Sequence, residues 1–271
     1  MANVLIPTDF SDNALNAAIY AVRLFGTNGN HFTVLNCYSM PHGRAGGFRN
    51  FDDMLAEDSA EGLVLFMEKL RDRLPEPVPA FETASEQGLL VDVIKRFEAD
   101  QVPPDVIVQG TQGASGLKRI LIGSNTAAVI MNSRTPVLAV PEEATFSAPR
   151  GIMLLEGGGR VEPSTLGLLV DLARANGSEV GIVHVKGPDN EDERTSATNL
   201  DEILGDIPHT RQTVAGSDVM MTLNELVDKN KADLVVAVHR RRGLFESLFK
   251  RSMTTRLVMN TRTPVLILHQ P

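Results

Sequence analysis

Short apolar runs separated by longer mixed stretches mark the first half of the chain. Most of the runs are rich in aliphatic and β-branched residues, and each has the length of a strand. The five runs lie at Val4–Ile6, Phe32–Cys37, Ala80–Ala84, Val106–Gln109 and Val137–Val140. Comparable runs in the second half lie near Ile152, Val180, Arg211, Leu234 and Val265. The pattern therefore predicts five strands in each half of the chain.

Helical periodicity fills the stretches between these runs. Leu15, Ala18, Ile19 and Val22 recur with the spacing of one helical face, and Ser11 is suited to cap that helix. Further helices are predicted over about residues 60–74, 89–98 and 125–133. Strands that alternate with helices need crossover connections, which make the sheet parallel. We therefore expect an α/β fold of two tandem, doubly wound five-stranded parallel-sheet domains.

The two halves are copies of one another. Residues 131–138, MNSRTPVL, return as MNTRTPVL with Met131 aligned to Met259, an offset of 128 positions. Near the start of each half, Asn28-Gly29 matches Asn176-Gly177 at an offset of 148 positions. Such an internal repeat indicates a duplicated fold. The second copy is therefore shorter by 20 residues in its middle.

The missing residues of the second copy are expected opposite Ser39–Ala60, a stretch rich in Gly, Asp and Asn. Two interpretations of this stretch stay open, a lid over a ligand and a disordered excursion. The predicted domains are residues 1–141 and 150–271, joined by a linker with proline at both ends, residues 141–149.

Composition narrows the function classes. The chain has 271 residues, of which 42% are hydrophobic and 22% charged, and a formal net charge of -8. No basic face is evident, which argues against nucleic acid as a partner. Cys37 is the single cysteine, so an internal disulfide is excluded and a reducing compartment is expected. The six histidines lack ligand spacing, so we expect no metal held by protein side chains.

The start of the chain lacks the basic region of a signal peptide, and no apolar stretch has the length of a membrane span. We therefore expect a cytoplasmic protein with no membrane partner.

A glycine-rich loop is the strongest candidate for chemistry. Gly110-Thr111-Gln112-Gly113 follows a predicted strand directly, and Gly123-Ser124 follows nine residues later at a predicted helix start. Glycine allows a backbone to turn with positive φ and to approach a ligand closely. A strand end, a glycine loop and a helix N-terminus together favour a bound phosphate, because free N–H groups and the helix dipole attract anions.

Three segments together resemble the universal stress protein family. They are the VLIPTDFS run of residues 4–11, the G-x2-G-x9-G-S loop and the TPVL strand of residues 135–138. The resemblance covers essentially the whole chain as a tandem pair. It implies a parallel sheet of strand order 3-2-1-4-5, in the adenine nucleotide α-hydrolase-like class of folds. Members with the loop bind ATP, and members without it act through dimerisation and partner contacts.

Carried over by position, the resemblance implies a nucleotide site in the first domain. Glycines 110, 113 and 123, Ser124 and the N–H groups of Asn125 and Thr126 would hold the phosphates. Asp9 would face the ribose or adenine, with Pro7 and Thr8 shaping that wall. Cys37 and Tyr38 would border the base, and Gln109 would touch the sugar. The ligand would be ATP, ADP or AMP, with Mg²⁺ or Mn²⁺ arriving with the triphosphate. Asn125 departs from the small apolar residue of many relatives.

The second domain has lost this pattern. The counterparts of the three glycines are Val238, Arg241 and Arg251, and that of Asp9 is Gly157, although Ser252 matches Ser124. We therefore interpret this domain as a degenerate copy that binds no nucleotide in the family's manner. Gly157-Gly158-Gly159 is interpreted as a turn. For the basic run of residues 239–242 with Lys250-Arg251, a solvated loop and a contact with an anionic group both stay open.

Three functions follow, with no catalytic residue assigned. The first is an ATP-binding stress-response module that regulates partner contacts and holds nucleotide in the first domain only. The second is a slow ATPase, disfavoured because the chain has no Walker lysine and no motif that would orient water. The third is a nucleotide-free dimeric scaffold. The resemblance implies pairing through the last strands, Val137–Val140 and Val265–Leu268, so the tandem would be a pseudo-dimer within one chain, and a further homodimer stays open.

Overall fold

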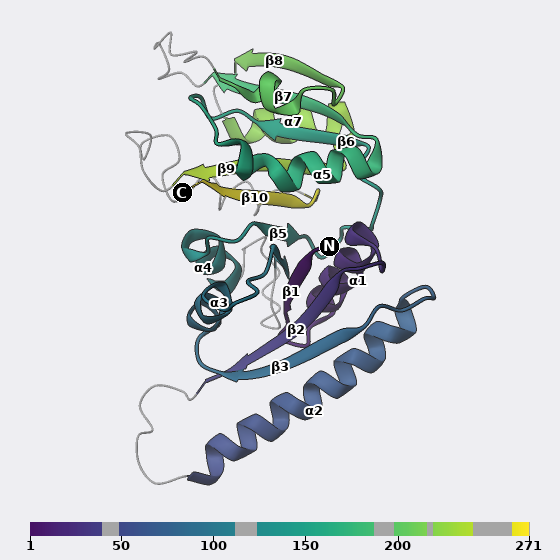
Figure 1. Ribbon diagram of the computed structural model, residues 1–271, viewed down its shortest axis with the longest axis vertical. Coiled ribbons are helices and arrows are strands. Elements are labelled where there is room, and N and C mark those ends of the chain that lie inside the picture. The colour runs from purple at the N-terminus through teal and green to yellow at the C-terminus, as the bar shows by residue number, and fades with distance from the viewer. Residues whose placement is uncertain (40–48, 112–123, 187–197, 216–218, 241–261, 271) are drawn as a thin grey trace. The chain divides into compact units, whose positions relative to one another are not determined.

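The computed structural model describes residues 1–39, 49–111, 124–186, 198–215, 219–240 and 262–270 (Figure 1). The chain divides into two compact units, unit 1 over Met1–Phe146 and unit 2 over Ser147–Pro271. Gly113, Gly123 and Arg241–Lys250 lie outside the described residues.

Unit 1 alternates strands and helices from its first residues. Its elements are β1 (Asn3–Pro7), α1 (Asp12–Phe25), β2 (His31–Tyr38), α2 (Arg49–Arg73), β3 (Phe81–Gln87), α3 (Leu90–Glu98), β4 (Val106–Gly110), α4 (Ser124–Asn132) and β5 (Val137–Val140). The strand order is β3-β2-β1-β4-β5, and all four pairs of neighbouring strands are parallel. This confirms the predicted doubly wound sheet of order 3-2-1-4-5.

Unit 2 repeats the arrangement with a much shorter helix between its second and third strands. Its elements are β6 (Gly151–Leu155), the 3-10 helix η1 (Pro163–Leu166), α5 (Gly167–Asn176), β7 (Glu179–Lys186), α6 (Leu200–Leu204), β8 (His209–Ala215), α7 (Val219–Asn230), β9 (Leu234–Arg240) and β10 (Val265–Gln270). The order β8-β7-β6-β9-β10 matches that of unit 1. Register also repeats, because Asn3 pairs with His31 and Gly151 pairs with Glu179.

Right-handed crossovers place the helices of unit 1 on two faces of its sheet. Helix α1 packs on β4 and contacts α2, which covers β2 and β3, while α3 and α4 pack against one another (Figure 1). Helix α1 comes close to the sheet because Ala17, Ala18 and Ala21 on its buried face are small. The central strands are buried throughout, and Ile6, Ile107 and Val108 have essentially no exposed surface. The core therefore fixes the carboxyl ends of β1 and β4 in place.

The start of α2 corrects the sequence prediction. A helix was expected from about residue 60, and Ser39–Ala60 was expected to be an insertion, but the helix begins at Arg49. Among its described side chains the buried positions begin only at Ser59, and before it Asp52, Asp53, Glu57 and Asp58 interrupt the apolar pattern. Helix α2 has 25 residues and its counterpart α6 has 5, which accounts for the 20 residues missing from the second copy.

The predicted linker starts as a packed segment of unit 1. The Asn16 side chain donates a hydrogen bond to the Ala144 carbonyl over 2.9 Å, and the rings of Tyr20 and Phe146 meet edge to face at 5.2 Å. Among the described residues, no helix combines the length and the apolar character that a bilayer crossing needs.

Candidate functional site

The carboxyl ends of β1 and β4 lie side by side in unit 1. These strands are neighbours in the sheet, with Val4 opposite Val106 and Leu5 opposite Ile107. From β1 the chain builds outward to β2 and β3, and from β4 it builds in the opposite direction to β5. This reversal is the topological switch point, where doubly wound sheets bind their ligands. The segment after β1 and the glycine loop after β4 both start there.

A tight turn over residues 8–11, the Asp9 turn, follows β1 and the buried Pro7. The Thr8 N–H donates to the Leu35 carbonyl over 2.8 Å, which ties the turn to β2. The exposed Asp9 carboxylate accepts hydrogen bonds from the Ser11 N–H at 3.2 Å and the Ser11 hydroxyl at 2.6 Å. Ser11 caps α1, as predicted, because its Oγ accepts from the Ala14 N–H. The carboxylate is thus held in a defined place at the surface.

The first turn of α4 is fastened to the end of β4. The Gln109 amide donates to Thr126 Oγ1 over 2.9 Å, and that hydroxyl donates to the Gly110 carbonyl over 2.9 Å. Gln109 and Thr126 are 6% and 2% exposed, so both side chains are interior groups. Gln109 Oε1 is buried without a hydrogen-bond partner among the described residues. The amide's sugar contact stays a prediction, while its observed partner is Thr126.

The α4 N-terminus faces the same edge of the sheet. Ser124 is its first residue, and Asn125 is exposed. The first N–H groups of a helix have no partner within it, and the dipole makes that end attractive to anions. Fastening α4 to β4 therefore keeps these donors at the carboxyl end of β4, the strand next to β1.

Gly110 has a packing role that the sequence did not reveal. A Cβ atom at this position would lie 2.8 Å from Cγ and Nδ2 of Asn13. Asn13 is 4% exposed and comes from α1, so its amide fills the space beside the strand end. Glycine is therefore needed here for the packing of α1 on β4, whether or not a ligand binds at the loop.

Cys37 and Tyr38 end β2, next to β1, and both are half-buried. The Tyr38 carbonyl accepts from the Gly88 N–H over 2.9 Å. Burial, with a smaller contribution from the Glu86 carboxylate, raises the pKa of the Cys37 thiol to about 12, and Arg96 acts in the opposite direction. The thiol is therefore protonated at neutral pH, and its place beside a bound base stays a prediction.

The switch point of unit 2, between β6 and β9, is occupied by one of the chain's own side chains. Arg240, the last residue of β9, donates from Nη2 to the carbonyl oxygens of Gly159 at 3.1 Å and Arg160 at 3.2 Å. Burial lowers the pKa of this guanidinium. Of the two alternatives for the basic run, the solvated loop is thus wrong for Arg240, while Arg241 and Arg242 lie outside the described residues.

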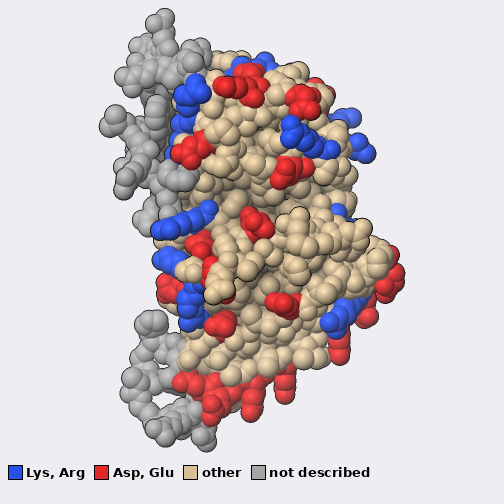
Figure 2. All heavy atoms as spheres, in the orientation of Figure 1, with Lys and Arg blue, Asp and Glu red and all other residues tan. Residues whose placement is uncertain are grey.

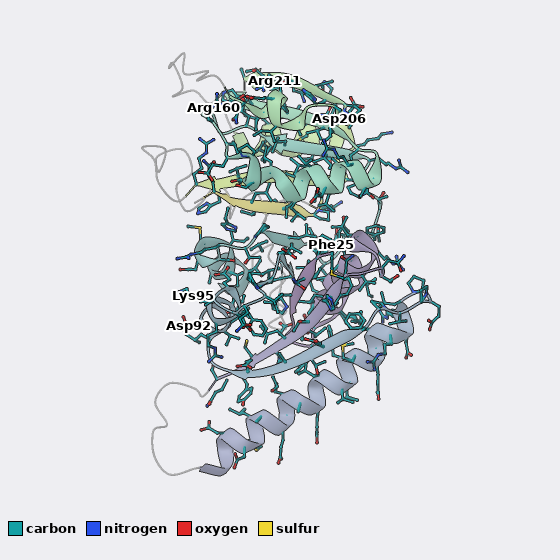
Figure 3. The ribbon with its side chains drawn as sticks, in the orientation of Figure 1. Phe25, Asp92, Lys95, Arg160, Asp206 and Arg211 are labelled. Atoms are coloured by element: carbon teal, nitrogen blue, oxygen red, sulfur yellow. The ribbon has the colours of Figure 1, made fainter. Side chains whose placement is uncertain are left out.

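A second set of charges binds the same edge of unit 2 together. Arg211 lies on β8 (Figure 3). It pairs through Nη1 with Glu156 and through Nη2 with Asp201, both at 2.5 Å. Glu156 takes the repeat position of Thr8, and its N–H donates to Val183, as that of Thr8 does to Leu35. These ion pairs therefore connect the end of β6, α6 and β8.

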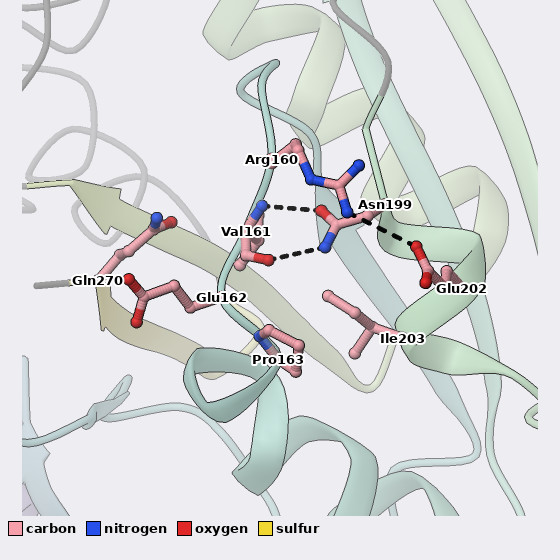
Figure 4. A pocket seen from close by; sticks show the side chains of 8 residues that line it. All are labelled: Arg160, Val161, Glu162, Pro163, Asn199, Glu202, Ile203 and Gln270. Atoms are coloured by element: carbon pink, nitrogen blue, oxygen red, sulfur yellow. Dashed lines mark hydrogen bonds and ion pairs between the residues drawn. The ribbon is translucent and has the colours of Figure 1, made fainter.

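A mixed-charge pocket of about 620 Å³ lies beside this edge (Figure 4). Its lining residues are Arg160, Val161, Glu162, Pro163, Asn199, Glu202, Ile203 and Gln270. The Asn199 amide is satisfied, because it donates to the Val161 carbonyl and accepts from the Val161 N–H, each over 2.8 Å. Arg160 and Glu202 form an exposed ion pair at 3.7 Å. The residues described by the structure include no group of three or more His, Cys, Asp or Glu side chains that could hold a metal.

The universal stress protein family model matches residues 1–141 and 189–269. The chain belongs to the universal stress protein family. A relative from Methanocaldococcus jannaschii, also a universal stress protein, is 32% identical over 143 residues, which cover 51% of this chain and 80% of the relative.

Solved structures show the same fold over the full length. A universal stress protein from Archaeoglobus fulgidus aligns with a TM-score of 0.70 and 18% identity, covering 99% of this universal stress protein and 96% of the other. A functionally unknown protein from Pseudomonas aeruginosa aligns with a TM-score of 0.58 and 14% identity, covering 100% and 93%. At these identities the likeness concerns the fold alone, which is the tandem α/β arrangement.

Proposed function

We propose that this universal stress protein binds one adenine nucleotide, ATP or its ADP or AMP form, in unit 1 only. In this proposal the bound nucleotide changes the protein's contacts with partners during a stress response. The observation that carries the proposal is the meeting of the Asp9 turn, the glycine-loop strand and the α4 N-terminus at the switch point. Ligands of doubly wound folds bind outside the carboxyl ends of the strands at this point.

Each group would have a separate part in holding the nucleotide. The Asp9 carboxylate would accept hydrogen bonds from the ribose or adenine, because a carboxylate is an acceptor only. The N–H groups of Asn125 and Thr126, with Ser124 and the loop glycines 110, 113 and 123, would receive the phosphates. Pro7, Thr8, Cys37 and Tyr38 would form the wall toward the base. Mg²⁺ or Mn²⁺ would arrive with the triphosphate and neutralise part of its charge.

Unit 2 supports the one-site form of the proposal. Its switch point holds the guanidinium of Arg240, bonded to the loop after β6. Gly157 stands where unit 1 has Asp9, so the carboxylate that would contact the sugar is missing. A nucleotide at this point would have to displace Arg240 from its two carbonyl partners.

The test uses matched variants of equivalent serines, Ser124→Ala in unit 1 and Ser252→Ala in unit 2. Purified protein is titrated with ATP and Mg²⁺ by calorimetry, and released small molecules are identified by mass spectrometry after denaturation. We expect one nucleotide per chain, with affinity reduced about tenfold by Ser124→Ala through loss of one charge-assisted hydrogen bond and unchanged by Ser252→Ala. Gly113→Val, which adds a branched side chain to the loop, should abolish binding.

Other outcomes would select another function. Two nucleotides per chain would contradict the one-site form. No binding of added ATP would favour the nucleotide-free scaffold, and size-exclusion chromatography with light scattering would then measure dimerisation. A steady-state assay of released phosphate decides between a binding module and a slow ATPase, and we expect no turnover above the background rate.

A further inference from the structure

The Asp9 turn holds an aromatic residue in an unusual backbone conformation. Phe10 has a φ of 65°, in the left-handed region that residues other than glycine rarely adopt. The equivalent residue of unit 2 is Gly158, with a φ of 75°. The left-handed turn is therefore a property of the repeated fold, and unit 1 keeps a phenylalanine where a glycine would fit without strain. Such strain persists only when the surroundings of the residue compensate for it.

The ring of Phe10 supplies that compensation by packing on α2. A Cβ atom on Gly62 would collide with Cε2 of Phe10, so the ring rests directly on the helix backbone. On the same helix, Phe66 has its ring centroid 6.2 Å from that of Phe10. Gly62 therefore leaves a space on α2 that the ring fills.

A buried polar chain joins α2 to the other side of the turn. The Ser59 hydroxyl on α2 donates to Asn36 Oδ1 over 2.8 Å, and Asn36 Nδ2 donates to the Thr8 carbonyl over 2.8 Å. Ser59 also shares a hydrogen bond of 2.7 Å with Ser85 on β3. Ser59 is 3% exposed and Asn36 is 8% exposed. In unit 2 this role passes to His184, whose Nδ1 lies 3.2 Å from the Glu156 carbonyl.

The two contacts bracket Asp9, since one holds Thr8 and the other holds Phe10. We propose that α2 is the positioning element of the Asp9 carboxylate, and that nucleotide binding at this carboxylate is coupled to the docking of α2. The inference rests on the proposed function. By linkage, a ligand that needs the ordered turn must stabilise the docked helix, and a docked helix must raise the affinity for the ligand.

The coupling would reach the protein surface through the exposed side of α2. Acidic side chains gather along this helix (Figure 2). Val64 and Leu65 on it are 60% and 58% exposed. Nucleotide binding at the Asp9 turn would thus change how stably α2, and with it this exposed surface, is docked on the sheet. Among the described residues of unit 2, the five-residue α6 takes this place in the fold, and Gly157 takes the position of Asp9.

Phe10→Gly is the decisive variant, because it reproduces the residue of unit 2, relieves the backbone strain and removes the side chain that packs on α2. Ser59→Ala breaks the polar chain without adding bulk, and Val64→Ala on the exposed side of α2 is the matched control. ATP affinity is measured by calorimetry. Hydrogen exchange over residues 52–73 is measured by mass spectrometry with and without saturating ATP.

We expect ATP to slow exchange across α2 in the wild type. Phe10→Gly should weaken ATP binding about tenfold and abolish the protection of α2, Ser59→Ala should do the same more weakly, and Val64→Ala should change neither. In an Asp9→Ala background, Phe10→Gly should have little further effect on affinity, because the ring acts through the carboxylate. A merely structural role of Phe10 would give additive losses in this cycle.

The failure of the inference differs from the failure of the proposed function. Wild-type protein that binds no ATP overturns the proposed function. Tight ATP binding that leaves α2 exchange unchanged, or that survives Phe10→Gly at wild-type affinity, overturns the inference alone.

Discussion

The guanidinium of Arg240 lies directly against Gly159. It donates to the Gly159 carbonyl over 3.1 Å, and its Nη1 would lie 2.9 Å from a Cβ atom on that glycine. Gly159 also has a φ of 71°, so alanine there would be strained by the backbone as well as crowded. Because the end of an arginine side chain can move aside, we expect backbone strain to dominate. Gly159→Ala should lower the free energy of unfolding of unit 2 by about 1–2 kcal/mol.

Urea unfolding followed by circular dichroism measures this loss. Gly167→Ala is the control, because no atom lies within 4 Å of a Cβ atom there and its φ of -51° suits a helix. Equal unfolding midpoints for the two variants would contradict the expected cost of an alanine in the left-handed backbone conformation of Gly159.

Gly110→Ala separates the packing role of the loop's first glycine from its ligand role. The new methyl group would meet the buried Asn13 amide at 2.8 Å, in a core contact that has no room to expand. We expect a loss of about 1–3 kcal/mol in stability without any nucleotide present. Adding Asn13→Ala should recover part of the loss, because it removes the group in conflict. Wild-type stability of Gly110→Ala would contradict the packing role.

The carboxylate of Glu98 makes the stability of unit 1 sensitive to acid. Its Oε1 accepts hydrogen bonds from the Ser133 hydroxyl at 2.5 Å, the Arg134 N–H at 2.7 Å and the Thr135 N–H at 3.0 Å. Burial raises the pKa of Glu98, but these hydrogen bonds outweigh burial and leave the pKa below its ordinary value of 4.5. A carboxylate whose pKa is lowered by folding stabilises the fold at pH values above its pKa in the unfolded chain. This contribution is lost as the pH falls through its pKa in the folded protein.

Glu98→Gln should therefore lower stability at pH 7 by about 1 kcal/mol, a figure reduced because the carboxylate is half-exposed. It should also flatten the fall in stability between pH 5 and pH 3, because glutamine does not titrate. Asp92→Asn is the control on the same helix, where Asp92 and Lys95 form an exposed pair (Figure 3). Parallel stability–pH curves for wild type and Glu98→Gln would contradict the assignment.

The strands could be predicted from the sequence because their signal is local. Val106–Gln109 and Leu234 onward are continuous apolar runs, as expected of strands buried on both faces. The internal repeat then allowed the strand positions of one copy to be assigned in the other. The strand order came from the family resemblance and was confirmed.

The supports of the candidate site could not be predicted, because they depend on residues far apart in sequence. Nothing local indicates that Asn13 fills the space beside Gly110, or that Phe10 adopts a left-handed φ to reach Gly62. Asn36 did carry a signal, as a polar residue inside an apolar strand, but its partners Ser59 and Thr8 are set by tertiary structure. Arg240 was noticed for its charge, and only the fold gave it carbonyl partners.

Cys37 should be chemically silent in the folded protein. Burial raises the pKa of its thiol to about 12, with Glu86 adding to the effect, so the reactive thiolate is scarce at pH 8. We expect slow reaction with a disulfide reagent such as DTNB in the native state and complete reaction in urea. Because burial is the larger cause, Glu86→Gln should accelerate the native reaction only slightly. Rapid stoichiometric labelling of native protein at pH 8 would show that the end of β2 opens readily, and a rigid wall for a base could not then be built from Cys37.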